Sequence, residues 1–201
     1  MTRLRFRSWE GRDITPQEWL RTWAEKYPSQ RYAKYDDLIA KHRSFSAGDF
    51  QEIGRWKDNA NTEDKWKPNV ASVAYAIWMQ AASESPKCPE QSDVAAFLED
   101  WSSRRYEDKN AKRTGQKPFG LSRATTLLHF LSGGRFPIFD SRVRRAMKRL
   151  LNQSVPNTIR WYLDSCCPLC SELAALCGAG DLRTLDKALF SYGAKTLSFS
   201  N

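Results

Sequence analysis

The chain has no long hydrophobic run. No stretch of its 201 residues approaches the roughly 20 apolar residues that a membrane-spanning helix needs. The N-terminal sequence MTRLRFRSWEGRD is basic, but it lacks the apolar core and cleavage site of a signal peptide. These absences predict a cytoplasmic protein with no membrane partner. They also lead us to expect that its five cysteines are mostly reduced.

Alternating strand patterns are scarce, and there is no internal repeat or low-complexity tract. Helix signals dominate instead, so we predict an all-α fold, with short β-like pieces possible only around Arg5–Trp9. Thr15-Pro16-Gln17-Glu18 combines a helix cap, a proline at the first position and a glutamate at the third. Further helices are expected at 32–42, from Ser46, from Thr62 through Ala81, from Ser92 through Trp101, and at 122–132, 141–152, 155–166, 169–177 and 181–192.

The segment SRRYEDKNAKRTGQK, residues 103–117, has no apolar face. We therefore predict a polar linker there. In this interpretation the whole chain, 1–201, is one helical domain of two lobes that share a core. The first lobe covers about 1–102 and the second covers 118–201.

Positive charge is in excess. Lysine and arginine number 32 against 23 aspartates and glutamates, which gives a formal net charge of +9. This excess favours a polyanionic partner, nucleic acid ahead of an anionic membrane, although a merely soluble basic surface would look the same. No obligate protein partner is evident from the sequence.

The main candidate functional residues lie in residues 119–149, FGLSRATTLLHFLSGGRFPIFDSRVRRAMKR. Gly120 begins a turn in which the N–H groups of the following helix can bind phosphate, and we expect Ser122 to cap that helix. Gly133-Gly134 should end it. Asp140 is then placed to cap a second helix with a basic face that suits a phosphate backbone: Arg142, Arg145 and Arg149.

These residues resemble the helix-hairpin-helix DNA glycosylase superfamily. The hairpin corresponds to Pro118-Phe119-Gly120-Leu121-Ser122-Arg123, and the apolar-Pro-apolar-Asp segment corresponds to Phe136-Pro137-Ile138-Phe139-Asp140. The match covers about 30 residues closely. The resemblance implies an all-α, two-lobed fold with a base-binding cleft between the lobes. It also implies that Asp140 is the catalytic carboxylate and that Gly120, Ser122 and Arg123 contact DNA.

Two departures from the family pattern bear on the chemistry. The second hairpin glycine is replaced by Ser122, and the lysine with which bifunctional members form a Schiff base is replaced, approximately, by Arg123. A guanidinium stays protonated and cannot perform that amine chemistry. The resemblance therefore implies a monofunctional enzyme that releases a damaged or modified base and leaves an abasic site, with no cofactor.

An alternative role for Asp140 is structural. Aspartate before a helix is often only an N-cap, so a non-catalytic helix-hairpin-helix DNA-binding protein is the competing hypothesis, and an RNA-directed role is a third. In the catalytic hypothesis, the ionised carboxylate stabilises the positive charge that develops on the deoxyribose. The sequence leaves open which base is excised, and whether the role is repair or attack on foreign, modified DNA.

The remaining candidate residues carry weaker signals. A flipped base needs an aromatic pocket, for which we select Trp56 with Lys57. The piece Ile53-Gly54-Arg55-Trp56-Lys57 also resembles an apolar-x-x-Trp-Lys element of uncharacterised bacterial relatives.

The cysteines and histidines complete the list of candidates. The cysteines of CCPLCSELAALC include a C-x2-C pair, Cys167 and Cys170, so a metal and buried free thiols are both open; we favour thiols and predict no metal. His42 and His129 lack ligand spacing, and each is most simply a packing or surface residue.

Overall fold

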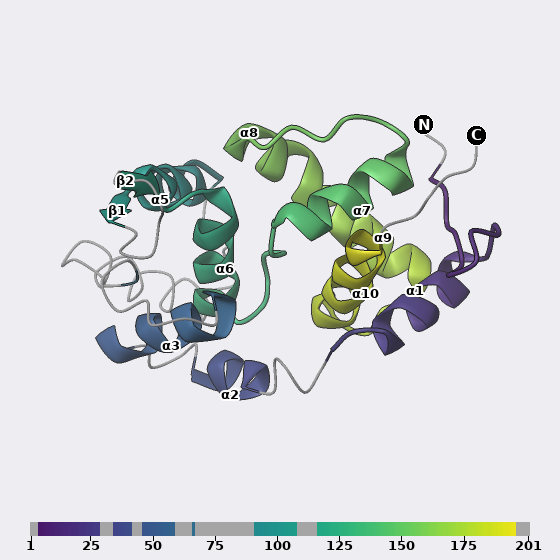
Figure 1. Ribbon diagram of the computed structural model, residues 1–201, viewed down its shortest axis with the longest axis horizontal. Coiled ribbons are helices and arrows are strands. Elements are labelled where there is room, and N and C mark those ends of the chain that lie inside the picture. Colours follow the sequence, from purple (N-terminus) through teal and green to yellow (C-terminus); the bar gives the residue numbers. More distant parts are fainter. Residues whose placement is uncertain are drawn as a thin grey trace. The chain divides into compact units, whose positions relative to one another are not determined.

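The computed structural model describes residues 4–28, 34–41, 46–58, 66, 91–107 and 116–195. The chain divides into two compact units (Figure 1). The first unit contains both Met1–Ser29 and Pro137–Asn201, and the second contains Gln30–Phe136. The described part is mostly helical, in agreement with the predicted all-α class. No described helix combines the length and the apolar character needed to cross a bilayer.

The first unit is built from helices at both ends of the sequence. Helix α1, Pro16–Glu25, packs against α10, Leu182–Ala194, which in turn packs against α7, Ser141–Leu151 (Figure 1). Between α7 and α10 lie α8, Ile159–Trp161, a π-helical segment, Tyr162–Cys166, and α9, Cys167–Cys177.

Local capping chemistry begins three of these helices where the sequence predicts. The Thr15 side chain accepts from the Glu18 backbone N–H, and the Glu18 carboxylate accepts from the Thr15 N–H in return. Asp140 caps α7 and Asp181 caps α10. The helix predicted at 155–166 is different, because Thr158 caps α8 and the helix therefore begins at Ile159.

Aromatic side chains fill the core of the first unit. Trp19 and Trp23 of α1 are fully buried. Both rings meet the Tyr192 ring of α10 edge-on, with centroids 5.5 Å and 5.0 Å apart. The β-like piece predicted around Arg5–Trp9 is reduced to a single bridge between Arg7 and Asp13.

The second unit gathers helices around α6, Leu121–Leu131. Contacts join α6 to α2, Tyr35–Ala40, to α3, Ala47–Asp58, and to α5, Gln91–Ser103. Ser92 lies inside α5 and does not begin it. The helix predicted from Thr62 through Ala81 lies outside the described residues.

The polar linker predicted at 103–117 is corrected by the structure. Its ends form two short antiparallel strands, β1, Arg105–Glu107, and β2, Gln116–Pro118, in register. A polar sequence pairs here because backbone hydrogen bonds, which need no apolar face, hold the two strands together. The boundaries between the compact units also fall elsewhere, after residues 29 and 136.

A close backbone approach shapes the core of the second unit. The buried Trp66 ring lies against Gly54 of α3, where an added Cβ would come within 2.4 Å of the ring. The same tryptophan meets Phe119 edge-on at 4.8 Å. Gly54 is therefore required by packing.

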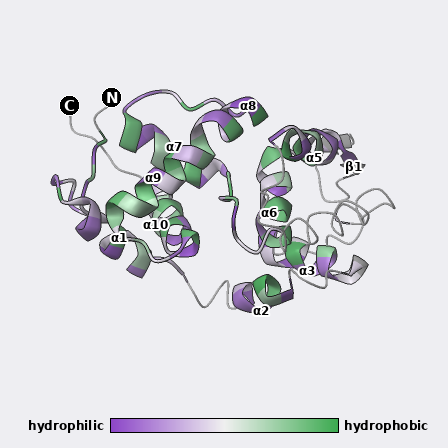
Figure 2. Ribbon diagram, turned by 180° about the vertical axis from the view of Figure 1, so that it is seen from behind, coloured by the Kyte–Doolittle hydropathy of each residue, from purple (hydrophilic) through white to green (hydrophobic). Residues whose placement is uncertain are grey.

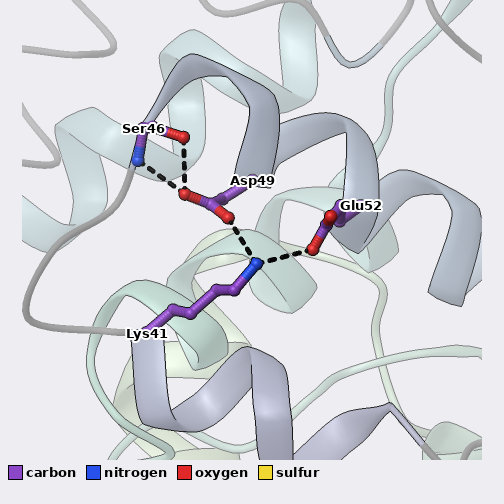
Figure 3. Close-up of polar contacts among 4 residues, drawn as sticks. All are labelled: Lys41, Ser46, Asp49 and Glu52. Atoms are coloured by element: carbon purple, nitrogen blue, oxygen red, sulfur yellow. Dashed lines mark hydrogen bonds and ion pairs between the residues drawn. The ribbon is translucent and has the colours of Figure 1, made fainter.

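A polar cluster joins α2 to α3 (Figure 3). Lys41 donates to Asp49 at 2.9 Å and to Glu52 at 2.8 Å. The backbone N–H and hydroxyl of Ser46 both donate to the other Asp49 oxygen at 2.7 Å. Burial of Asp49 opposes its ionisation, but the hydrogen bonds from Ser46 and Lys41 outweigh burial and lower the pKa of this carboxyl. Ser46 is expected to cap α3 by accepting from its backbone. Here it is instead the donor, and the Asp49 carboxylate is the acceptor.

Replacing Asp49 by asparagine should lower the free energy of unfolding by roughly 1.5–3 kcal/mol, because charge-assisted hydrogen bonds are lost. A carboxyl with a lowered folded pKa stabilises the protein above the unfolded pKa of about 3.9, and this contribution is lost as pH falls through the folded value. Urea unfolding at pH 7 and in steps below pH 4 measures both effects. If the free energies of unfolding of the wild type and Asp49→Asn differ by the same amount below pH 4 as at pH 7, the assignment is contradicted. Asp36→Asn, on the exposed side of α2, is the matched control.

Candidate functional site

Asp140 stands at the N-terminus of α7. One carboxylate oxygen accepts the backbone N–H groups of Arg142 at 2.9 Å and Val143 at 3.0 Å. The residue is half-buried, and its backbone is extended. The two donors and the positive end of the helix dipole both favour the ionised carboxylate. The predicted N-cap is therefore confirmed, and it holds the carboxylate in one orientation.

The segment before Asp140 is anchored by buried aromatic residues. Phe139 is fully buried, stacked on Trp161 at 5.4 Å and tilted against Tyr162 at 5.6 Å. The Tyr162 hydroxyl donates to the Pro137 carbonyl at 2.8 Å, and burial raises the pKa of this phenol. The sequence analysis missed both partners, because Trp161 and Tyr162 lie more than twenty residues further along the chain.

Helix α10 supports the first turn of α7 by direct backbone contact. A Cβ on Gly193 would lie 1.8 Å from the Arg142 carbonyl oxygen, a distance that no side chain can occupy. The glycine therefore lets the two helices touch at the turn that holds Asp140.

The basic helix is amphipathic, with polar and apolar residues on different sides (Figure 2). Its apolar side is buried and includes Val143, Ala146, Met147 and Leu150. Leu151, the last residue of the helix, is half-buried.

The cations of α7 differ in how they are engaged. Arg142 lies over the Phe190 ring, 4.1 Å from its centroid, and Arg144 donates to the Val155 carbonyl at 3.1 Å. Arg149 donates to the carbonyls of Tyr192 and Lys195 at the end of α10. Arg145 and Lys148 are exposed. Of the three α7 arginines predicted to contact DNA, Arg145 is thus the most accessible, while Arg149 also bonds to the end of α10.

The predicted hairpin turn lies in the second unit. Gly120 has φ +80°, which glycine adopts without strain, and its N–H donates to the Ser102 carbonyl at 3.0 Å. Gly120 itself is the N-cap of α6, so the prediction that Ser122 caps this helix is wrong. Ser122 lies inside the first turn because the glycine already redirects the chain two residues earlier. In the first turn of α6 the Arg123 and Ala124 N–H groups donate to the Gly120 carbonyl at 3.2 Å. An anion at this turn would therefore bind the two preceding N–H groups, which come before the intrahelical hydrogen bonds.

Arg123 is held by the protein. Its Nε donates to the Asp58 carboxylate at 2.9 Å, and Nη1 donates to the Phe119 carbonyl at 3.0 Å. Both side chains of the ion pair are largely buried. Arg123 therefore fixes the turn to the end of α3, and its positive charge is balanced by Asp58.

Trp56 and Lys57, the proposed base-pocket pair, lie near the end of α3 and are half-buried. The Trp56 ring meets Phe130 edge-on at 5.0 Å and Tyr35 at 6.0 Å. Trp56 is thus part of an aromatic cluster at the face of α6.

His129 has a larger structural role than its sequence context predicts. It is fully buried, with Nε2 2.6 Å from the Tyr35 hydroxyl and Nδ1 2.6 Å from the Phe136 carbonyl. Because a carbonyl only accepts, Nδ1 carries a proton, and a neutral ring then accepts the Tyr35 O–H at Nε2. The histidine joins α2 to the loop after α6.

The four cysteines that the structure describes lie in the first unit as free thiols. Cys166, Cys170 and Cys177 are buried, and Cys167 is half-buried. Burial raises the pKa of Cys167 to about 12 and that of Cys177 to about 11, so both thiols are protonated at neutral pH. The described residues contain no cluster of histidine, cysteine or acidic side chains arranged to hold a metal ion.

The predicted site residues therefore form two groups. Asp140, Arg142, Arg145 and Arg149 share the first unit, whereas Gly120, Ser122, Arg123, Trp56 and Lys57 share the second. Comparisons of the chain with protein-family models, with curated proteins and with solved structures give no match.

Proposed function

We propose that the protein is a monofunctional DNA glycosylase that hydrolyses the N-glycosidic bond of a damaged or modified base and leaves an abasic site. The observation that carries the proposal is Asp140. Its carboxylate is oriented by two backbone N–H groups at the start of a basic helix. The mostly helical fold is compatible with the two-lobed helix-hairpin-helix architecture that the sequence resembles.

The chemistry suits a carboxylate that stays ionised. Cleavage of the bond between base and sugar builds positive charge on the deoxyribose, as in other glycoside hydrolyses. A fixed negative charge stabilises that cation without reorganising during the reaction. The Asp140 carboxylate is the group that would face the sugar or orient the attacking water.

The residues at the turn support hydrolysis without strand cleavage. A Schiff base with the abasic sugar needs a neutral amine. Arg123 offers only a guanidinium, and this group is bonded to Asp58 and to the Phe119 carbonyl. An abasic site is therefore the expected product, and alkali should be needed to break the strand.

Asp140→Asn should lower the single-turnover rate of base release by roughly 10²–10³-fold, the effect of removing one electrostatic stabiliser. Asparagine caps helices about as well as aspartate, so the fold should survive. The assay incubates the protein with duplexes that carry varied damaged or modified bases and then treats them with alkali. Asp181→Asn is the matched control, because Asp181 caps α10 in the same way.

Full base release by Asp140→Asn would refute the catalytic assignment. Binding of the duplexes without base release on any substrate would instead favour a non-catalytic DNA-binding protein. In that protein Asp140 would be a helix cap alone.

A further inference from the structure

The first unit contains a strongly basic hollow away from Asp140. It has a volume of about 430 Å³ and lies between the N-terminal segment, the second half of α7 and the end of α10. Five of its seven lining residues are cations, and none of the seven is a carboxylate: Arg5, Arg7, Arg145, Lys148, Arg149, Asn152 and Tyr192.

The walls of this basic hollow are fixed by the backbone. The Arg5 N–H donates to the Leu150 carbonyl at 2.9 Å, which holds the N-terminal segment against the last turn of α7. Arg145, Lys148 and Arg149 are three and four residues apart, so they share one side of the helix. Asn152 ends α7 with a left-handed backbone, φ 53°.

Arg149 is a half-buried residue in the lining of the hollow. Its guanidinium donates to the Tyr192 carbonyl and, at 2.6 Å, to the Lys195 carbonyl. Burial lowers the pKa of this guanidinium, and the nearby charge of Arg145 lowers it further. Because Arg145 and Lys148 share this side of the helix with Arg149, an anion bound there would lie close to several cations at once.

Helix dipoles account for only part of this charge. Cations near the C-termini of α7 and α10 are favourable, which explains Lys148 and Arg149 but neither Arg5 nor Arg145. Arg7 forms a 3.6 Å ion pair with Asp13. The exposed cations Arg5, Arg145 and Lys148 remain around the opening, where they face solvent.

The size of the hollow points to a chain of phosphates. Its volume has room for on the order of ten water molecules, which is more than one phosphate group fills. Lys148 lies eight residues beyond Asp140, or roughly 12 Å along the helix. At about 3.4 Å per nucleotide of one DNA strand, this corresponds to three or four nucleotides.

We infer that the basic hollow binds the phosphodiester backbone of DNA, three or four nucleotides from the base that is released. The register rests on the proposed function of Asp140, whereas the binding itself does not. In this arrangement α7 would contact one strand at both ends, through the carboxylate at its N-cap and through the cations near its C-terminus.

The test compares two double variants that lose the same charge. Arg5→Ala with Lys148→Ala removes exposed cations of the hollow, while Arg21→Ala with Arg160→Ala removes exposed cations elsewhere in the first unit. Fluorescence anisotropy with a labelled duplex measures Kd over a range of salt concentrations. Each lost phosphate contact should reduce the slope of log Kd against log salt by about 0.9, so the hollow variant should lose about 1.8. The control variant should keep the wild-type slope.

A second duplex tests the register. When uncharged methylphosphonate linkages replace the phosphates three and four nucleotides from the modified base on either side, the wild type and the hollow variant should show the same slope. If the difference persists on this duplex, the inferred register is wrong.

Two results would overturn the inference. One is a wild-type slope for the hollow variant on the first duplex. The other combines equal DNA salt slopes for the two proteins with a melting temperature that inorganic phosphate raises in the wild type but not in the hollow variant. The ligand of the hollow would then be a free phosphate compound. If base release requires Asp140 but the wild type and the hollow variant have equal salt slopes, only the inference about the hollow fails. A slope difference without base release would remove the glycosylase proposal alone.

Discussion

Replacing Gly193 by alanine is expected to lower the free energy of unfolding of the protein by about 3 kcal/mol or more. The added Cβ would lie 1.8 Å from the Arg142 carbonyl oxygen and 2.5 Å from its carbonyl carbon. Both are backbone atoms, so a change of rotamer cannot relieve the clash, and α10 must move away from α7. Thermal unfolding followed by tryptophan fluorescence should show a midpoint lowered by roughly 6–12 °C.

The matched control is Gly180→Ala. A Cβ at Gly180 would meet no atom within 4 Å, and its backbone does not have the positive φ that alanine disfavours. Its melting temperature should stay close to that of the wild type. Equal melting temperatures for Gly193→Ala and Gly180→Ala would show that the contact between α7 and α10 is not as tight as the structure has it.

The second large effect is expected from His129→Leu, at about 3 kcal/mol or more of unfolding free energy. Leucine fills similar space but makes neither of the two 2.6 Å contacts of the imidazole. The Tyr35 hydroxyl and the Phe136 carbonyl would each lose this partner, and a buried polar group left without one costs about 1–3 kcal/mol. Urea unfolding at neutral pH measures the loss.

A double-mutant cycle with Tyr35→Phe separates the hydrogen bond from packing. Tyr35→Phe alone should cost less than His129→Leu, because it removes only one of the two contacts. The combined variant should be less destabilised than the sum of the single changes, since both remove the same interaction. Strict additivity would mean that the two side chains do not interact.

Local chemistry explains which parts of the fold could be predicted. The capping box at Thr15, the N-cap at Asp140 and the N-cap at Asp181 each involve residues no more than three positions apart. Their helices therefore begin where the sequence indicates. Apolar residues recur at helical spacing in α6, and all four of them are buried: Ala124, Leu127, Leu128 and Leu131.

Partners that are distant in sequence explain what could not be predicted. Ser122 looks like a cap, but the Gly120 N–H bonds to Ser102, and this contact sets the turn. Its place after the hairpin predicts that Arg123 binds phosphate. In the structure it forms an ion pair with Asp58, which lies 65 residues earlier. The Tyr35 contact to His129 spans 94 residues. A one-dimensional pattern contains no information on such pairs.

The division of the chain has a consequence for how the protein is made. Helix α1 packs against α10, and all of the second unit is synthesised between them. Early in synthesis, Trp19 and Trp23 have no α10 to bury them, whereas every segment of the second unit is present before α7 is made. Vectorial synthesis thus favours folding of the second unit first.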